Sequence, residues 1–410
     1  MLKQINARID GYLDYAVELQ TKLSAIPAIS PDAGGEGELD KTLFLEAELK
    51  KLKFDQFLRA DAPDSRAKGG VRPNLIARYK GQSSARTFWI MSHTDIVPPG
   101  ELSLWQGDPY TVRREGGKIF GRGVEDNQQG LLSGLLCLRA MMESGLRPPC
   151  DVALLFNADE ENGSKYGVDY LIKNRLDLFS KNDIFVVPDG GSADGKLVEV
   201  AEKSILWLRI KTVGRQCHAS MPKLGNNAFK AASELAFRLG ALYRKFNVKD
   251  KLFDPPTSTF EPTKKEANVP NINTIPGDDV FYLDCRVLPA YKLEDVLAEI
   301  KTIAAAVEKK HGVTVTFEPV QKEQAAPATP AESEVVQLIL GGIKKVYGYK
   351  GKPRGIGGGT VAAYLRRAGF DAVVYAKLDE SAHMPNEYCI LENMMSDAKV
   401  FAHAALNMKP

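Results

Sequence analysis

Histidine and carboxylate side chains follow short apolar segments at several points along this chain of 410 residues. The apolar run at residues 88–91 leads to His93 and Asp95, and a second run leads to the adjacent carboxylates Glu160 and Glu161. Imidazoles and carboxylates bind divalent metal ions, and both also move protons in hydrolytic reactions. The spacing therefore raises the question of why buried strands would carry such groups at their ends.

Three further segments carry the same residue types. Asp189 ends a third apolar run, Asp126 lies in a glycine-rich loop before an apolar helix pattern, and His383 lies in a polar loop near the C-terminus. Taken singly, each has a structural interpretation; an aspartate before a helix, for example, is often its N-cap. Carboxylates gathered at one place repel one another unless a cation balances them. Together they predict two divalent metal ions, zinc first, with cobalt or manganese as alternatives.

The elements that position these residues alternate between strands and helices. Apolar runs of strand length precede His93, Glu160 and Asp189, and a buried helix pattern covers residues 128–144. This alternation predicts an α/β fold with a mostly parallel sheet and helices on both faces. In such a sheet, ligands bind outside the carboxyl ends of the strands, which is where these residues fall.

The sequence changes in character after about residue 204, where strands alternate between apolar and polar residues. Such alternation is typical of antiparallel strands with one buried face. We predict a metal-binding catalytic domain at residues 1–205 and 322–410, with an inserted α+β domain at residues 206–321 that serves in dimerisation or as a lid. Helices are also predicted over residues 1–26 and 38–59.

The overall composition argues against several classes of function. With 44% hydrophobic residues, 26% charged residues and a net charge of +2, the chain resembles a globular protein that binds neither nucleic acid nor a membrane surface. The five cysteines are scattered without a Cys-x-x-Cys pair, which favours a reducing cytoplasm over a disulfide framework. The N-terminal segment lacks the apolar core of a signal peptide.

Seven motifs resemble, in order, those of the M20 family of dinuclear metallohydrolases. They are a long motif from SHTDIVPPG to GRGVEDNQQG, then DEENGS, GRQCHASMP, NTIPGD, DCRVLP, GGGT and HMPNE. The family includes succinyl-diaminopimelate desuccinylase, acetylornithine deacetylase, aminoacylase and several dipeptidases. The resemblance implies an enzyme that hydrolyses amide or peptide C–N bonds with a water molecule bridging two metal ions.

The resemblance also implies a ligand role for each candidate. His93 and Asp189 would hold one ion, Glu161 and His383 would hold the other, and Asp126 would bridge them. Two ions need such a bridging carboxylate. The peptide bond that follows the bridging aspartate is typically cis in the family, so we expect a cis bond there.

Three residues are implied to assist the reaction without binding metal. Glu160 would be the general base, and Asp95 would orient the His93 ring through a hydrogen bond. His218, in the inserted domain, would stabilise the oxyanion, often from the partner subunit of a homodimer.

Substrate contacts are implied for residues in three further regions. An arginine fork suits a substrate carboxylate, and backbone amides near a helix N-terminus suit an anion. The residues concerned are Arg286, Asn273, Gly358, Gly359 and Thr360.

The chain departs from the family pattern in two places, of which the first removes a lysine near the site but no ligand and the second bears on the substrate. Asn127, Gln128 and Gln129 replace the Met-Lys-Gly that often follows the bridging aspartate, and Asp189 stands where deacylases tend to have glutamate. The chain length and the GGGT motif favour a deacylase of small N-acyl amino acids, of the acetylornithine deacetylase or succinyl-diaminopimelate desuccinylase kind. Asp189 favours the alternative, a dipeptidase or aminopeptidase acting on short peptides.

Two hypotheses from other classes remain open at this stage. A non-enzymatic binding protein with this fold would be expected to lack a ligand or the base, but all are present. A dinuclear phosphoesterase would usually have more histidines at its site, and this chain has only five in total.

Overall fold

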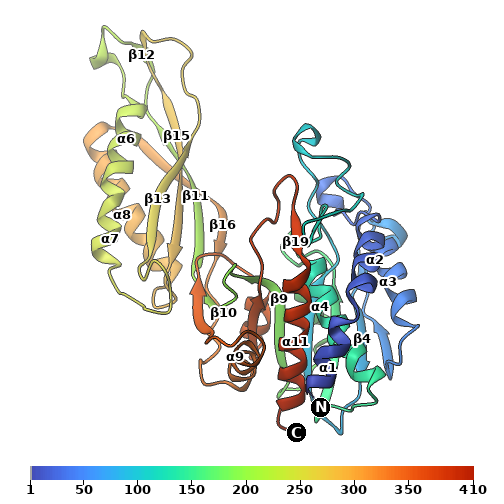
Figure 1. The fold of residues 1–410 in the computed structure, drawn as a ribbon. Helices are drawn as coiled ribbons and strands as arrows, with labels where there is room; N and C mark the ends of the chain where they lie inside the picture. The colour runs from blue at the N-terminus through green and yellow to red at the C-terminus, as the bar shows by residue number, and fades with distance from the viewer. Residues whose placement is uncertain (1) are drawn as a thin grey trace. The chain divides into compact units, whose positions relative to one another are not determined.

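A computed structural model describes residues 2–410, and the chain divides into two compact units (Figure 1). The larger unit comprises the described residues up to Val200, with Ala328–Arg354 and Thr360–Pro410. The inserted unit comprises Ala201–Pro327 and the short segment Gly355–Gly359. The inserted unit is therefore built from two segments that lie apart in the sequence.

The larger unit is built on an eight-stranded sheet of order β1-β4-β8-β5-β9-β18-β10-β17. The central neighbours β8, β5, β9 and β18 run parallel, whereas β1, β4 and β10 pair in antiparallel fashion on either side. The predicted α/β class with a mainly parallel central sheet is confirmed. The strands are β1 (Gln56–Arg59), β4 (Leu75–Tyr79), β5 (Ser83–His93), β8 (Cys150–Asn157), β9 (Ile184–Gly191), β10 (Leu197–Glu202), β17 (Lys352–Ile356) and β18 (Asp371–Ala376).

Helices cover both faces of this sheet, because alternate side chains of each strand point to opposite sides. On one face, Trp89 and Met91 pack with residues of α5 (Val168–Asn174) and α10 (Ala362–Arg367). On the other face, α4 (Gln128–Glu143) approaches so closely that a Cβ at Gly134 would lie 2.9 Å from the Ile90 side chain. Helices α1 (Leu2–Asp10), α9 (Glu334–Tyr347) and α11 (Leu391–Asn407) complete this layer.

Two helix predictions near the N-terminus are wrong in part. The helix predicted over residues 1–26 begins with Met1, which lies outside the described residues, and the rest forms α1 and α2 (Leu13–Ser24) with a break at Gly11. Glycine disfavours a helix interior, which accounts for the break. The segment predicted as helix over residues 38–59 forms α3 (Leu39–Leu49) and then strand β1. Pairing with β4 satisfies the backbone groups of β1 and overrides its helical pattern.

The inserted unit packs helices on one face of a four-stranded antiparallel sheet of order β13-β15-β11-β16. Leu206, Leu208 and Ile210 of β11 are buried in its core, whereas Trp207 between them is exposed. The predicted period-two pattern with one buried face is therefore confirmed. The elements are α6 (Ala228–Arg238), α7 (Leu242–Lys245), α8 (Leu293–His311), β11 (Ser204–Val213), β13 (Thr259–Lys265), β15 (Asp278–Val287) and β16 (Thr314–Glu323).

Smaller ladders complete the two units. They join β2 (Ala62–Pro63) to β3 (Val71–Arg72), β12 (Cys217–His218) to β14 (Thr274–Ile275), and β7 (Lys118–Phe120) to both β6 (Arg113–Glu115) and β19 (Tyr388–Ile390). All five cysteines carry free thiols. Within residues 2–410, no helix has the length and apolar character needed to cross a membrane.

Candidate metal centre

The candidate ligands meet at the carboxyl ends of the parallel strands. His93 is the last residue of β5 and pairs in register with Asn157, the last residue of β8. Glu161 follows β8 by a few residues, and Asp189 lies near the end of β9. Because neighbouring parallel strands end at the same sheet edge, these side chains converge although they are far apart in sequence.

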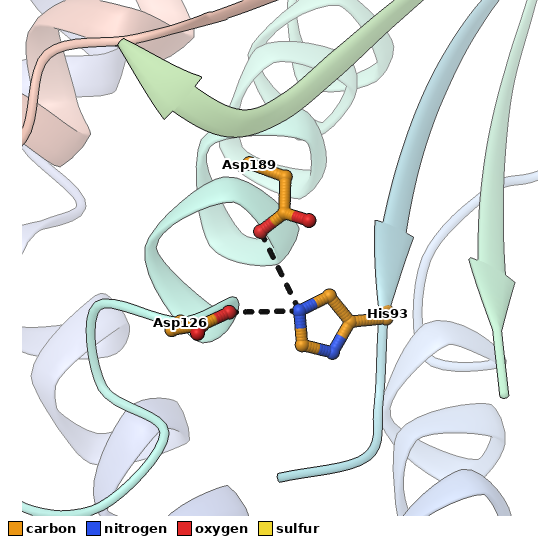
Figure 2. A group of neighbouring side chains, drawn as sticks. All are labelled: His93, Asp126 and Asp189. Carbon is orange, nitrogen blue, oxygen red and sulfur yellow. Dashed lines mark hydrogen bonds and ion pairs between the residues drawn. The ribbon is translucent and has the colours of Figure 1, made fainter. Parts of the chain in front are cut away.

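His93, Asp126 and Asp189 form one group of potential ligands. The Nε2 atom of His93 lies 2.9 Å from Oδ1 of Asp126 and 3.4 Å from Oδ1 of Asp189. Figure 2 shows both carboxylates directed at this one ring nitrogen. All three residues lie in the larger unit, and the His93 side chain is almost fully buried.

Asp126, Glu161 and His383 form a second group. The Nε2 atom of His383 lies 3.1 Å from Oδ2 of Asp126 and 3.0 Å from Oε2 of Glu161. Asp126 therefore offers Oδ1 to the first group and Oδ2 to the second, which is the arrangement that a bridging carboxylate requires. The peptide bond between Asp126 and Asn127 is cis, as predicted.

The donor set fits divalent ions. It combines two imidazoles with three carboxylates, a mixture that suits zinc and similar metals. The Oε1 atom of Glu161 is buried without a hydrogen-bond partner among the described residues. Such an atom costs free energy unless another group satisfies it, and a cation would do so.

The charges of this cluster shift the pKa values of its members. Burial opposes protonation of His93, but the neighbouring carboxylates, Asp189 foremost, outweigh it and raise the pKa well above its ordinary value. Hydrogen bonds to Asp126 and Glu161 raise the pKa of His383 to about 10. Burial, followed by the charge of Asp189, raises the pKa of Glu160 well above the ordinary value for glutamate. The raised pKa values of both histidines thus reflect the carboxylates gathered around them.

Asp95 organises the site through the main chain as well as through His93. The ring Nδ1 of His93 lies 3.0 Å from the backbone carbonyl of Asp95 and 3.4 Å from its carboxylate. The two carboxylate oxygens of Asp95 accept hydrogen bonds from the backbone N–H groups of Glu160 and Glu161, at 3.1 and 3.0 Å. This residue therefore connects the end of β5 to the loop after β8, a link that the sequence did not indicate.

A comparison with protein families identifies the family of this chain. The profile described as "Peptidase family M20/M25/M40" matches residues 89–407, which include every ligand candidate. The chain belongs to this family. It is a metallohydrolase that acts on amide or peptide bonds, and its family membership implies the use of divalent metal ions.

Relatives of this M20 metallohydrolase carry names of both general and specific kinds. An uncharacterized metallohydrolase of Methanococcus maripaludis is 38% identical, and the match covers 95% of this chain and 98% of the relative. A succinyl-diaminopimelate desuccinylase of Dinoroseobacter shibae is 28% identical over 73% of this chain and 75% of its own length. The crystal structure of the aminopeptidase PepT from Bacillus cereus shares the fold, with a TM-score of 0.75, 18% identity, and coverage of 96% of this chain and 98% of that one.

The predicted oxyanion and substrate residues of this M20 enzyme lie outside the two ligand groups. His218 is exposed in β12 of the inserted unit, where its Nδ1 lies 2.8 Å from the Ser220 hydroxyl. The amide oxygen of Asn273 accepts a hydrogen bond from Asn271. Their roles in oxyanion and substrate binding stay predictions.

Arg286 is already engaged within the inserted unit. Its Nε and Nη2 donate to the Asp284 carboxylate at 2.8 and 3.1 Å, and its Nη1 donates to the Gly357 carbonyl at 2.8 Å. A substrate carboxylate would therefore have to share or displace these partners. The glycine-rich turn precedes α10, with Gly358 and Gly359 in the inserted unit and Thr360 in the larger one.

Three residues contact the candidate ligands or the loops that carry them; the sequence marked Asn127 only as a departure from the family motif, and Glu387 and Glu125 not at all. Asn127 donates to the side chain of Asp189, and the Glu387 carboxylate accepts from the backbone of the loop that carries Asp126. Glu125 accepts from the loop that carries His383. All three are buried and lie inside the M20-like motifs. A buried polar residue beside a ligand is the signal that could have found them.

Proposed function

We propose that this chain removes the acyl group from small N-acyl amino acids at a pair of divalent ions, with zinc as the preferred metal and cobalt or manganese as substitutes. The observation that carries this proposal is the division of Asp126 between the two ligand groups through its two carboxylate oxygens. The match to a succinyl-diaminopimelate desuccinylase favours an acylated amino acid as substrate.

When bound, the two ions polarise the amide carbonyl and lower the pKa of the attacking water. Glu160 takes the proton that leaves this water and delivers it to the amine nitrogen as the C–N bond breaks. The products are then a carboxylic acid and a free amine. Glu160 is adjacent in the chain to the candidate ligand Glu161, a position from which a carboxylate can accept a proton and then release it.

Asp95 keeps this base in place. It binds the backbone N–H groups of Glu160 and Glu161, so the base and the adjacent ligand are held by one carboxylate. The expected roles of His218 at the oxyanion, and of Arg286, Asn273 and the turn at residues 358–360 at the substrate, belong to the same proposal. So does a homodimer formed through the inserted unit.

A specific observation favours a second candidate, hydrolysis of short peptides. Asp189 is shorter than the glutamate that deacylases of this family tend to have, and aspartate at this position resembles the dipeptidases and aminopeptidases. Under this alternative, the substrate would carry a free N-terminal amine in place of the acyl group.

A substrate panel on zinc- and cobalt-loaded protein separates the two candidates. It would set N-succinyl-diaminopimelate, N-acetylornithine and other N-acyl amino acids beside free dipeptides and tripeptides, with released primary amine as the readout. Higher kcat/KM for the acylated compounds is the expected result. Higher kcat/KM for peptides would replace the deacylase by a peptidase, and full activity after metal removal would refute the metal mechanism for both.

A further inference from the structure

The two departures from the family motifs contact each other. Asn127 replaces the methionine that often follows the bridging aspartate, and Asp189 replaces a glutamate. The Nδ2 atom of Asn127 lies 2.6 Å from Oδ1 of Asp189 and 2.7 Å from the carbonyl oxygen of Pro188. The two residues that depart from the family pattern, 62 positions apart in the chain, thus form one hydrogen-bonded pair.

The orientation of the Asn127 amide follows from its partners. Both Asp189 Oδ1 and the Pro188 carbonyl only accept hydrogen bonds, so the amide nitrogen and not its oxygen must face them. Asn127 is only 2% exposed, so water does not compete for these bonds. The pair therefore makes a shielded, charge-assisted hydrogen bond, which is stronger than a neutral one.

The oxygen that Asn127 contacts is the one that faces the metal centre. Oδ1 of Asp189 also lies 3.4 Å from Nε2 of His93. A carboxylate oxygen has two lone pairs, so the bond from Asn127 occupies one of them and leaves the other directed toward His93. The bond also restricts rotation of the Asp189 carboxylate, whose side chain is one methylene shorter than glutamate.

Near Asn127, the backbone of α4 lies in close contact with the end of β9. A Cβ at Gly130 would lie 2.3 Å from the carbonyl oxygen of Pro188 and 3.0 Å from Oδ1 of Asn127. Only glycine permits this approach. The backbone that carries Asn127 is therefore held against the backbone that carries Asp189.

We propose that Asn127 is a positioning residue that orients Asp189 as a ligand for the ion shared with His93, and that Asn127 and Asp189 act as a matched pair. This inference rests on the proposed function, because it assumes that ions bind at the site, and it identifies what holds the shorter ligand in place. Asn127 contacts Asp189 and the Pro188 carbonyl and belongs to neither group of candidate ligands.

The test measures metal binding rather than turnover. Metal-stripped wild type and Asn127→Leu would be titrated with Zn²⁺ by calorimetry and with Co²⁺ by its visible absorption spectrum. Loss of an outer hydrogen-bond partner typically weakens metal binding by about 10- to 100-fold, and we expect that loss for one ion of the pair. The matched control is Asn226→Leu, which removes an amide that donates to the His311 carbonyl in the inserted unit.

A double substitution tests the matched pair itself. In protein that carries Asp189→Glu, the longer carboxylate would no longer depend on Asn127, so adding Asn127→Leu should change the metal affinity by less than about threefold. If the changes in metal-binding free energy of the two single variants add up to that of the double variant, the two residues act independently, and this would overturn the proposal.

A second variant at Asn127 keeps the test possible if the first does not fold, and each further result has a stated meaning. Asn127→Ser, which is small and polar, replaces Asn127→Leu if the latter does not fold in the metal-free state. Unchanged affinity in the folded variant, or an equal loss in Asn226→Leu, would overturn the inference alone. Wild-type protein that bound no Zn²⁺ or Co²⁺ would overturn the proposed function as well.

Discussion

Glu387 and Glu125 each bind the loop that carries the other. The Glu387 carboxylate accepts hydrogen bonds from the backbone N–H groups of Gly123, Glu125 and Asp126 at 2.9–3.1 Å, and from Arg122 Nη1 at 2.7 Å. All of its bonding capacity is thus used to hold the loop that ends in Asp126, the candidate bridging ligand.

In turn, Glu125 binds the loop that carries His383, another candidate ligand. The Glu125 carboxylate accepts from the Asp379 N–H at 2.9 Å and from the Ser381 hydroxyl at 2.7 Å. His383 lies two residues beyond Ser381. The loops of Asp126 and His383 are therefore connected by two buried carboxylates as well as by the ligands themselves.

Substituting Glu387→Gln should destabilise the metal-free protein by about 3 kcal/mol. The substitution places an NH₂ group against backbone donors and leaves buried Arg122 without its charged partner. Urea unfolding followed by circular dichroism measures the effect. The exposed Glu332→Gln is the control and should leave the midpoint unchanged; an equal shift in both variants would contradict the role given to Glu387.

Substituting buried Arg72→Met should lower the free energy of unfolding more than the same substitution at exposed Arg66 does. Arg72 is fully buried, pairs with Glu38 through two nitrogens and lies 3.2 Å from Asp159, so its removal leaves buried carboxylates without a cation. We expect a loss of about 3–5 kcal/mol in the free energy of unfolding. Arg66 shares the partner Asp64 but is exposed, so Arg66→Met should cost only a small fraction of that. Similar losses in the two variants would show that burial does not decide the effect.

Asp397 should make the metal-free protein less stable as the pH rises. Burial raises the pKa of this carboxyl to about 7, although hydrogen bonds from the Lys377 N–H and Gln129 partly oppose the shift. A carboxyl with a higher pKa in the folded chain binds its proton more tightly there. Its stabilising contribution is therefore complete below about pH 4 and is lost as the pH rises to about 7, a change of roughly 4 kcal/mol.

The comparison of wild type with Asp397→Asn isolates this contribution. The difference in unfolding free energy between the two proteins should move in favour of the variant from pH 4 to pH 8, because asparagine carries no proton to lose. Chelator in all samples keeps metal binding out of the comparison. A difference that stays constant across this range would contradict the buried titration, and exposed Asp295→Asn serves as the control.

Substituting Glu160→Gln should separate catalysis from metal binding. The variant loses the group that accepts the proton but keeps all candidate ligands, so kcat should fall by about 10²–10⁴-fold at unchanged metal content. Glu161→Gln should instead lower the affinity for metal, because Glu161 belongs to a ligand group. Elemental analysis after dialysis, together with kcat, gives both quantities. An active Glu160→Gln protein would eliminate Glu160 as the base.

Much of the candidate metal centre could be anticipated from residue type and position. His93, Glu161 and Asp189 follow apolar strand patterns, and parallel strands end at a common edge, so their convergence follows from periodicity alone. The α/β class could be inferred from the same alternation of strands and helices. The resemblance to the family motifs then implied how these residues would be divided between two ions.

The local sequence pattern did not predict the secondary structure where a strand distant in sequence pairs with the segment. The segment predicted as helix over residues 38–59 ends in β1 because β4 offers a ladder of backbone hydrogen bonds. This pairing partner does not show in the residues of the segment itself. The contacts of Asn127 with Asp189, and of Glu387 with the Asp126 loop, were equally hidden. They join residues 62 and 261 positions apart, and they depend on rotamers and on the close approach of packed backbones. The sequence by itself thus determined which groups could bind metal, whereas only the tertiary structure decided which neighbours hold those groups in place, because hydrogen bonds require a direction and a distance that no linear spacing specifies.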